Sequence, residues 1–325
     1  MWPFDSRVTS SAPGPAPAPV PEPIPLKPRR ATWGFAEGDA LADGRYLLRH
    51  LGGGSLCEVW LAWDERLLSL VVAKILRPDQ LGDAHARADL EREAALLTRL
   101  AHPGLVRGFG AALDAPRPHL LLEHVEGPTL VSLVRRYGPL PMVQLLPVSL
   151  HLAAVLHYLA GEGVAHLDVK PGNVVVSVTP RLLDLGIALP VERAARLTRA
   201  IGTDSFMAPE QCAPGTGRGP VGPAADVWAL GATLSFASCG EVPFPRAAGA
   251  RHSPDPAVRF PQLTGLAPRL PDNAPPLLVD LLARMLAPDP CHRPAARDVS
   301  AALEPLVTEL PTQVTLPRRA RAASR

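Results

Sequence analysis

The sequence has few cysteines, and they lie far apart. Its 325 residues include four, Cys57, Cys212, Cys239 and Cys291, and no two of them form a CxxC pair. Disulfide frameworks and zinc sites both need cysteines in sets of characteristic spacing. The pattern therefore predicts neither kind of site and favours a reducing compartment, so we expect a cytoplasmic protein.

Net charge and long apolar runs are scarce as well. The 33 Lys and Arg against 31 Asp and Glu leave a formal charge of +2, which argues against broad electrostatic capture of nucleic acid or anionic membrane. His, Pro or Glu interrupts the apolar stretches before the roughly 20 residues that span a bilayer. The first residues, MWPFDSRV, contain no apolar signal core. We expect no nucleic-acid partner and no membrane insertion.

Proline, in contrast, is abundant, and much of it lies at the N-terminus. Of 39 prolines, nine fall within residues 1–32, mostly at every second position. Such a segment lacks the amide donors and apolar mass that a fold needs. We predict a disordered arm over residues 1–37, a spacer in the preferred interpretation and a docking site for a proline-reading partner in the alternative. Residues 311–325 predict a disordered basic tail.

The region between, residues 38–310, has the composition of a folded core. β-Branched and aromatic residues around a glycine cluster predict antiparallel hairpins over 45–75, followed by a helix over 83–100 that His102-Pro103 stops. Short strands are expected near 105–110 and 120–124, and the chain from 143 onward has mainly helical patterns. This order predicts an α+β protein in two lobes, a small antiparallel β-sheet lobe with one helix (about 38–124) and a larger helical lobe (about 125–310).

Two weak signals lie in the first lobe. Residues 51–59, LGGGSLCEV, form a glycine-rich hairpin turn whose backbone amides can approach phosphate oxygens, although any tight hairpin can contain three glycines. Lys74 follows in an apolar strand, where a lysine is usually a snorkelling edge residue. It can instead hold a phosphate if a carboxylate orients it, and Glu93 on the following helix is suitably placed.

The strongest signal is the run VAHLDVKPGNVVV at residues 164–176. Asp168 and Asn173 lie in a loop where one side chain can face an incoming hydroxyl and the other a metal ion, and Lys170 can neutralise a transferring phosphoryl group. Asp184 ends the apolar strand LLD before a glycine turn, as a hard-oxygen ligand suited to magnesium. The order of these groups after Lys74 and Glu93 is not expected by chance.

In this order the motifs resemble those of eukaryotic-type (Hanks-type) serine/threonine protein kinases of the kind found in bacteria. The similarity covers about residues 38–310 and continues through GTDSFMAPE at 202–210, DVWALG at 226–231 and HRP at 292–294. The resemblance implies a two-lobed protein-kinase-like fold. It implies transfer of the γ-phosphoryl group of Mg-ATP to Ser or Thr hydroxyls of a protein substrate, with autophosphorylation.

The resemblance also assigns roles by position. Asp168 and Lys170 are the catalytic residues, and Asn173 and Asp184 hold Mg²⁺, with Mn²⁺ as the alternative metal. The residues assigned to ATP binding are Leu51, Gly52, Gly53, Gly54, Val59, Ala73, Lys74, Glu93, Glu123 and Val125.

Scaffold roles follow from the same likeness. It implies a structural ion pair between Glu210 and Arg293. It implies that Asp226 caps the central helix and braces the catalytic loop through backbone amides, and that Thr203 contacts Asp168 and Lys170.

Three positions depart from the family pattern. Leu167 stands where many members have an arginine before the catalytic aspartate, Cys57 replaces the third glycine of the phosphate loop, and Leu185 replaces a phenylalanine. None of these changes removes a phosphate, metal or base group. Leu167 and Cys57 motivate one alternative function, a catalytically weak pseudokinase or scaffold. A second alternative is a small-molecule phosphotransferase of the same fold.

The departure at Leu167 leads to a prediction. The arginine absent there normally binds a phosphate on the activation segment, so we predict that activity does not depend strongly on phosphorylation of Thr198. Thr198→Ala should transfer phosphate at a rate close to that of the parent chain. A large loss of rate in a folded Thr198→Ala protein would contradict this.

Overall fold

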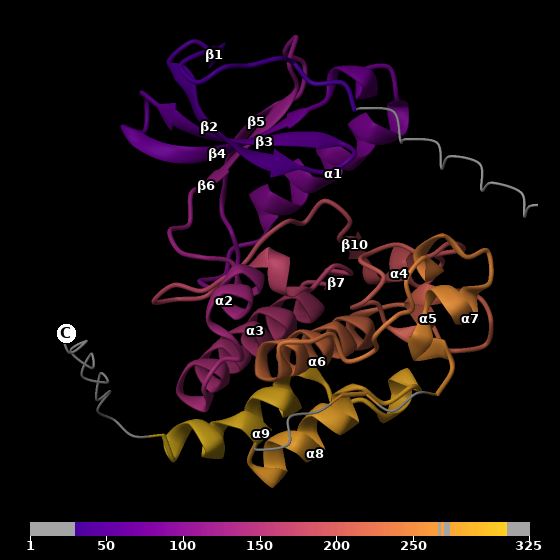
Figure 1. Cartoon of the computed structure of the whole chain (residues 1–325). Helices are drawn as coiled ribbons and strands as arrows, with labels where there is room; N and C mark the ends of the chain where they lie inside the picture. The colour runs from indigo at the N-terminus through magenta and orange to yellow at the C-terminus, as the bar shows by residue number, and fades with distance from the viewer. Residues whose placement is uncertain (1–29, 266–267, 270–273, 311–325) are drawn as a thin grey trace, which may run out of the picture.

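The computed structural model of the chain describes residues 30–265, 268–269 and 274–310. The expectations for residues 1–29 of the arm and for the tail at 311–325 lie outside the described residues. Within them the chain forms two lobes, a β-rich lobe with helix α1 above a helical lobe (Figure 1). The expected α+β, two-lobed fold class is confirmed.

The small lobe is built on one antiparallel sheet. In the described residues its strand order is β1-β2-β3-β4-β6-β5. Asp83 caps the N-terminus of α1 by accepting a hydrogen bond from the His85 backbone amide at 2.8 Å. The elements of this lobe are β1 (Ala40–Ala42), β2 (Arg45–Gly53), β3 (Cys57–Asp64), β4 (Ser69–Leu76), α1 (Ala84–Arg99), β5 (Gly108–Ala112) and β6 (His119–Glu123).

The last part of the predicted arm packs on this sheet. Trp33 and Phe35 lie against the buried cluster on the sheet's outer face. The Trp33 backbone amide donates to Glu58 Oε1 at 2.9 Å, its indole Nε1 donates to the Leu76 carbonyl at 2.8 Å, and the Arg117 guanidinium lies over both rings. The arm boundary at residue 37 therefore lies too far along the chain, because the partly buried side chains of Trp33 and Phe35 already pack against the lobe.

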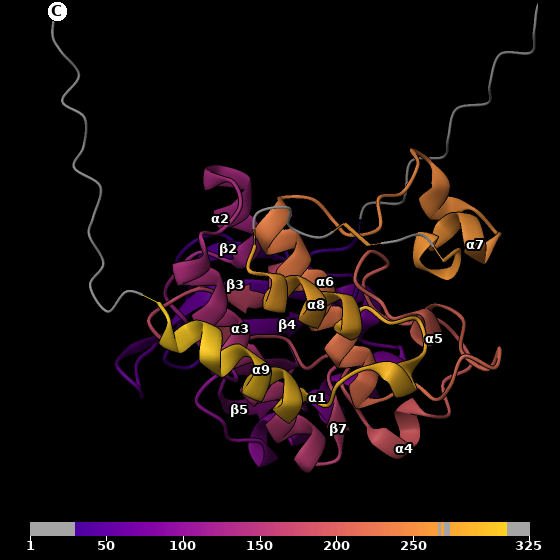
Figure 2. The same cartoon turned by 90° about the horizontal axis from the view of Figure 1, so that it is seen from below.

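The large lobe is built around α3 and α6, and α9 packs on α3 from below (Figure 2). Its longer helices are α2 (Leu130–Tyr137), α3 (Met142–Gly161), α6 (Pro223–Cys239), α8 (Pro276–Met285) and α9 (Ala296–Thr308). Its short helical turns are η2 (Pro171–Asn173), α4 (Val191–Ala194), α5 (Pro209–Cys212) and α7 (Pro256–Arg259). Its two-residue strands are β7 (Val164–Ala165), β8 (Val174–Val175), β9 (Arg181–Leu182) and β10 (Leu189–Pro190).

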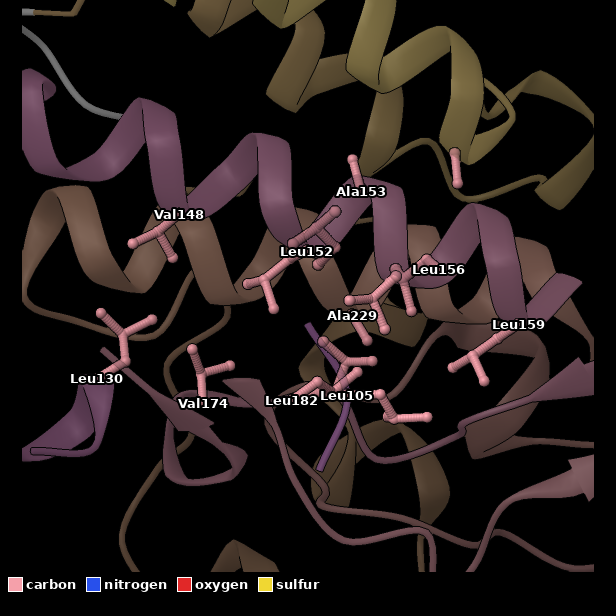
Figure 3. Packing of buried hydrophobic residues seen from close by; sticks show 14 of the residues in the cluster. Leu105, Leu130, Val148, Leu152, Ala153, Leu156, Leu159, Val174, Leu182 and Ala229 are labelled. Carbon is pink, nitrogen blue, oxygen red and sulfur yellow. The ribbon is translucent and has the colours of Figure 1, made fainter. Parts of the chain in front are cut away.

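The apolar face of α3 supports the segment in which the polar motifs lie. Leu152 and Leu156 of α3 point toward Leu105 and Leu182, with Val174 alongside (Figure 3). β8 and β9 pair with each other, so Asn173, which precedes β8, and Asp184, which follows β9 by two residues, are held over the same core.

Helix α3 differs from the sequence expectation about apolar runs. It has 20 residues and a mean hydropathy of 1.5 over its most apolar window, so by length and composition it could cross a bilayer. Half of that window is buried inside the protein, and the helix packs against α6 and α9. These contacts are those of a core helix.

The packing of Trp33 gives a stability prediction. Trp33→Ala should lower the free energy of unfolding by about 1–3 kcal/mol, since it removes aromatic burial and the indole hydrogen bond. Tyr137→Ala is the matched control, because Tyr137 is an exposed aromatic residue at the end of α2. Its effect should stay within about 0.5 kcal/mol in urea denaturation. Equal effects of the two substitutions would show that Trp33 contributes nothing to the lobe.

Candidate active site

Lys74 joins the two lobes through its ammonium group. Its Nζ lies 2.9 and 2.7 Å from the two carboxylate oxygens of Glu93 on α1 and 2.7 Å from Asp184 Oδ1. Lys74 lies toward the C-terminal end of β4, and Glu93 is 1% exposed. Burial by itself would lower the pKa of Lys74, but the two carboxylates outweigh it and raise the pKa above its usual range. The predicted pairing of Lys74 with Glu93 is present in the structure.

Asp184 is held in its charged form by the same contact. Burial would raise its pKa, but the Lys74 ammonium and the backbone amide of Gly186 lower it to about 2. A Cβ at position 186 would lie 3.1 Å from both Asp184 Oδ1 and Lys74 Nζ. Glycine therefore leaves room for this ion pair.

The glycine-rich turn adopts backbone angles that only glycine tolerates. Gly52 and Gly53 have φ of +120° and +151°, and a Cβ on Gly53 would lie 2.4 Å from the Cys57 carbonyl oxygen. Gly54 is held from outside the turn, because Arg77 Nε donates to its carbonyl at 3.0 Å. Arg77 was not among the predicted residues, since a lysine or arginine after a strand has no distinctive pattern.

One predicted ATP-binding residue lies on the wrong face of its strand. Ala73 is fully buried in the outer cluster, on the side of the sheet where Trp60 packs. Side chains alternate along a strand, so Lys74 shares its face with Val72, which packs against the inner core. The structure therefore assigns the apolar position beside Lys74 to Val72. Val59 stands opposite Lys74 in the register of β3 and β4.

The remaining predicted nucleotide-binding positions lie at the edges of this arrangement. Leu51 precedes the glycines in β2 and is 43% exposed. Glu123 ends β6, and Val125 follows it, half-buried, in the connection toward α2. This is the segment where the chain passes from one lobe to the other.

The catalytic loop forms a second cluster around Asp168. Lys170 Nζ lies 2.5 Å from Asp168 Oδ2 and donates to Thr203 Oγ1 at 2.8 Å, and Thr203 donates to Asp168 Oδ1 at 2.7 Å. Asn173 Nδ2 donates to the Asp168 carbonyl at 2.9 Å. Both carboxylate oxygens of Asp168 are thus oriented, and the predicted contact of Thr203 with Asp168 and Lys170 is confirmed.

The donor set suits a magnesium ion. The Asn173 amide nitrogen is used inside the loop, so its oxygen remains as an acceptor, and Asp184 supplies a charged carboxylate. Mg²⁺ is commonly bound by one or two protein oxygens together with substrate phosphates. Within the described ranges, no cluster of three or more His, Cys, Asp or Glu residues could hold a metal by itself.

Two residues of the site have left-handed backbones. Leu167 and Asp184 both have φ of +65°, a conformation that costs about 1–3 kcal/mol in a residue other than glycine and persists only under surrounding constraint. Asp226 of α6 supplies such constraint, since its carboxylate accepts from the backbone amides of His166 and Leu167, both at 2.7 Å. The predicted bracing by Asp226 is confirmed. The predicted helix cap is wrong, because Gly222 occupies the N-cap position of α6.

The predicted scaffold ion pair is also present. Arg293 donates to both oxygens of Glu210 at 2.6 and 2.8 Å, and both side chains are inaccessible to solvent. Its guanidinium also lies over the Trp228 ring. This pair fixes the end of the segment that runs from Asp184 to Glu210, which is called the activation segment below.

The other two departures from the family pattern lie in apolar surroundings. Leu185 is fully buried in the core cluster beneath the site. Cys57 is 2% exposed, and burial raises the pKa of its thiol to about 12. The structure thus gives Cys57 the surroundings of an inert core residue.

Fold and site together define a protein kinase domain. The family model described as "Protein kinase domain" matches residues 46–302, and the chain belongs to this family. The resemblance to bacterial serine/threonine kinases is confirmed by its relatives.

Three of these relatives are similar over much of this chain. Serine/threonine-protein kinase PknB of Mycobacterium leprae is 34% identical over 60% of this chain and 32% of the relative. The DNA damage-responsive serine/threonine-protein kinase RqkA of Deinococcus radiodurans is 34% identical over 75% and 37%. PknD of Mycobacterium tuberculosis is 34% identical over 76% and 37%. The chain thus spans about a third of the length of these relatives.

The burial of Cys57 gives a chemical prediction. The thiolate is the reactive form of cysteine, and with a pKa of about 12 roughly one Cys57 side chain in ten thousand is ionised at about pH 8. Iodoacetamide should therefore label exposed Cys291 but leave Cys57 unlabelled in the native protein, and label both in denaturant, as read by peptide mass spectrometry. Native labelling of Cys57 at the rate of Cys291 would restore a redox role for this position.

Proposed function

We propose that the chain is an ATP-dependent serine/threonine protein kinase, with Mg²⁺ as its metal and autophosphorylation as a further activity. The observation that carries this proposal is the convergence of the chemical groups. The Lys74 ammonium lies within hydrogen-bond distance of both Glu93 and Asp184, and Asp168 and Lys170 form a second cluster on the same core. The names of the relatives and the family membership support the same activity.

The geometry suits in-line transfer of a phosphoryl group. In the proposed reaction the acceptor oxygen forms a bond to the γ-phosphorus, the bond to the β,γ-bridging oxygen breaks, and ADP leaves. Asp168 takes the hydroxyl proton, and its carboxylate is already oriented by Thr203 and Lys170. Lys74 binds the α- and β-phosphates, and Lys170 neutralises charge on the group in transfer. Magnesium, when bound, neutralises charge on the phosphate oxygens.

The two alternative functions are less well supported. A pseudokinase typically lacks one of the groups needed for phosphoryl transfer. In this chain those groups are all present, and neither Leu167 nor Cys57 displaces any of them. A small-molecule phosphotransferase does not need the link from Lys170 through Thr203 to the activation segment. That link favours a protein hydroxyl as the acceptor. A docking partner for the proline-rich arm and a cytoplasmic location stay predictions.

The proposed function is tested by single-turnover transfer from labelled ATP to a generic protein substrate. Asp168→Asn should lower the transfer rate by about 100-fold or more, since general-base catalysis contributes that much, while nucleotide affinity stays unchanged. Asp114→Asn, at an exposed aspartate, is the matched control and should transfer at the parental rate. Intact nucleotide binding without transfer in the parent chain would instead establish the scaffold function.

A further inference from the structure

Asp204, the residue after Thr203, is held by two arginines from a distant part of the chain. Arg246 Nη1 lies 2.8 Å from Asp204 Oδ2, and Arg259 donates from Nη2 to Oδ1 at 3.0 Å and from Nε to Oδ2 at 3.2 Å. Both arginines lie in the segment between α6 and α8, in and near α7. The Asp204 side chain is 12% exposed. Arg259 is itself oriented by the ring of Phe260, over which it lies.

The charges of this cluster are complementary. Burial would raise the pKa of Asp204, but hydrogen bonds from Arg259 and Arg246 lower it below its usual value. The carboxylate is therefore ionised at neutral pH, and one anion faces two cations. Charge-assisted, two-pronged arginine–carboxylate contacts fix geometry as well as contributing energy.

Two buried glutamines hold the backbone on either side of Asp204. Gln211 Nε2 donates to the Leu167 carbonyl at 2.7 Å and also to the Ile201 carbonyl, so it ties the catalytic loop to the activation segment. Gln262 Nε2 donates to the carbonyls of Asp204 at 2.8 Å and Met207 at 3.0 Å. Residues 201–207 are thus fixed by unmodified groups of the chain.

Thr203 lies in the middle of this stretch, and its position matters for the reaction. Its hydroxyl bridges Asp168 and Lys170, so a shift of its backbone would disorient the proton acceptor. At Leu167, where the family usually has a phosphate-binding arginine, the side chain is apolar and 2% exposed. Asp204 with Arg246 and Arg259 provides a carboxylate–arginine contact in the activation segment itself, next to Thr203.

We propose that Asp204 is a positioning residue, and that its ion pairs with Arg246 and Arg259 hold Thr203 against Asp168 and Lys170 without any phosphate on the activation segment. This inference rests on the proposed kinase function. It assigns to Asp204 no contact with substrate. It gives the segment around α7, which supplies Arg246 and Arg259, a role in positioning Thr203 at the proposed active site.

The test compares two aspartate–arginine contacts that lie in different lobes. Asp204→Asn should lower kcat/KM for a protein substrate by about 10- to 100-fold, as expected for a misplaced catalytic group, while KM for ATP changes by less than about twofold. Asp64→Asn is the matched control, because Asp64 is 1% exposed and lies 2.7 Å from Arg45 in the small lobe, on a strand pair away from the acceptor side. It should lose stability but keep its kcat/KM. Asp204→Glu should recover most of the activity.

A double-mutant comparison separates positioning from general destabilisation. If Asp204 acts through Thr203, adding Asp204→Asn to Thr203→Ala should lower kcat/KM no further. Parental kcat/KM in Asp204→Asn, or losses that add fully in the double variant, would overturn the proposal.

A structural readout keeps the inference distinct from the proposed function. In hydrogen exchange, backbone amides of residues 201–207 should exchange faster in Asp204→Asn than in Asp64→Asn. This comparison applies even if the parent chain transfers no phosphate, a result that would refute the kinase function. Equal exchange in the two variants would refute the positioning role of Asp204.

Discussion

The ammonium group of Lys74 is the point on which the two lobes depend. A buried ammonium is costly unless opposite charges and hydrogen bonds surround it, and this one is satisfied by Glu93 of the small lobe and Asp184 of the large lobe. The contact with Glu93 places α1 against the sheet, and the contact with Asp184 brings the start of the activation segment to Lys74. Because the Lys74 ammonium is shared by two carboxylates, the loss of either carboxylate would alter the contact that Lys74 makes with the other one.

The second cluster depends on constraint of the backbone. Leu167 and Asp184 adopt left-handed conformations that would relax if their surroundings allowed it. The Asp226 carboxylate holds the amide of Leu167, and the Gln211 amide holds its carbonyl. The central helix α6 and the turn α5 therefore stabilise a strained loop whose side chains would carry out the proposed reaction. In the proposed reaction Glu210, Arg293 and Asp226 would act by fixing the backbone rather than by touching substrate.

The structure corrects the sequence interpretation where a local pattern had more than one meaning. Ala73 was assigned to the nucleotide side of β4 from its place before Lys74, yet a shift of one residue in a strand reverses the face, and Val72 lies on that side. Trp33 and Phe35 follow a proline-rich stretch, so composition placed them in the arm, whereas their aromatic surface packs on the sheet. For α3, the helix itself was expected, but His and Pro led us to expect shorter apolar stretches, whereas the structure has a continuous 20-residue apolar helix that packs in the core.

The sequence alone determined the family, the two-lobed α+β fold and most of the chemical groups, because the spacing of Lys74, Glu93, Asp168, Asn173 and Asp184 is read along the chain. Only the tertiary structure decided how those groups are held. Asp204 meets Arg246 and Arg259 across 42 and 55 residues, and Gln211 meets Leu167 across 44. A polar residue such as Asp or Gln follows no sequence periodicity that would reveal such distant partners. Only the folded structure therefore shows which charged and polar groups contact one another.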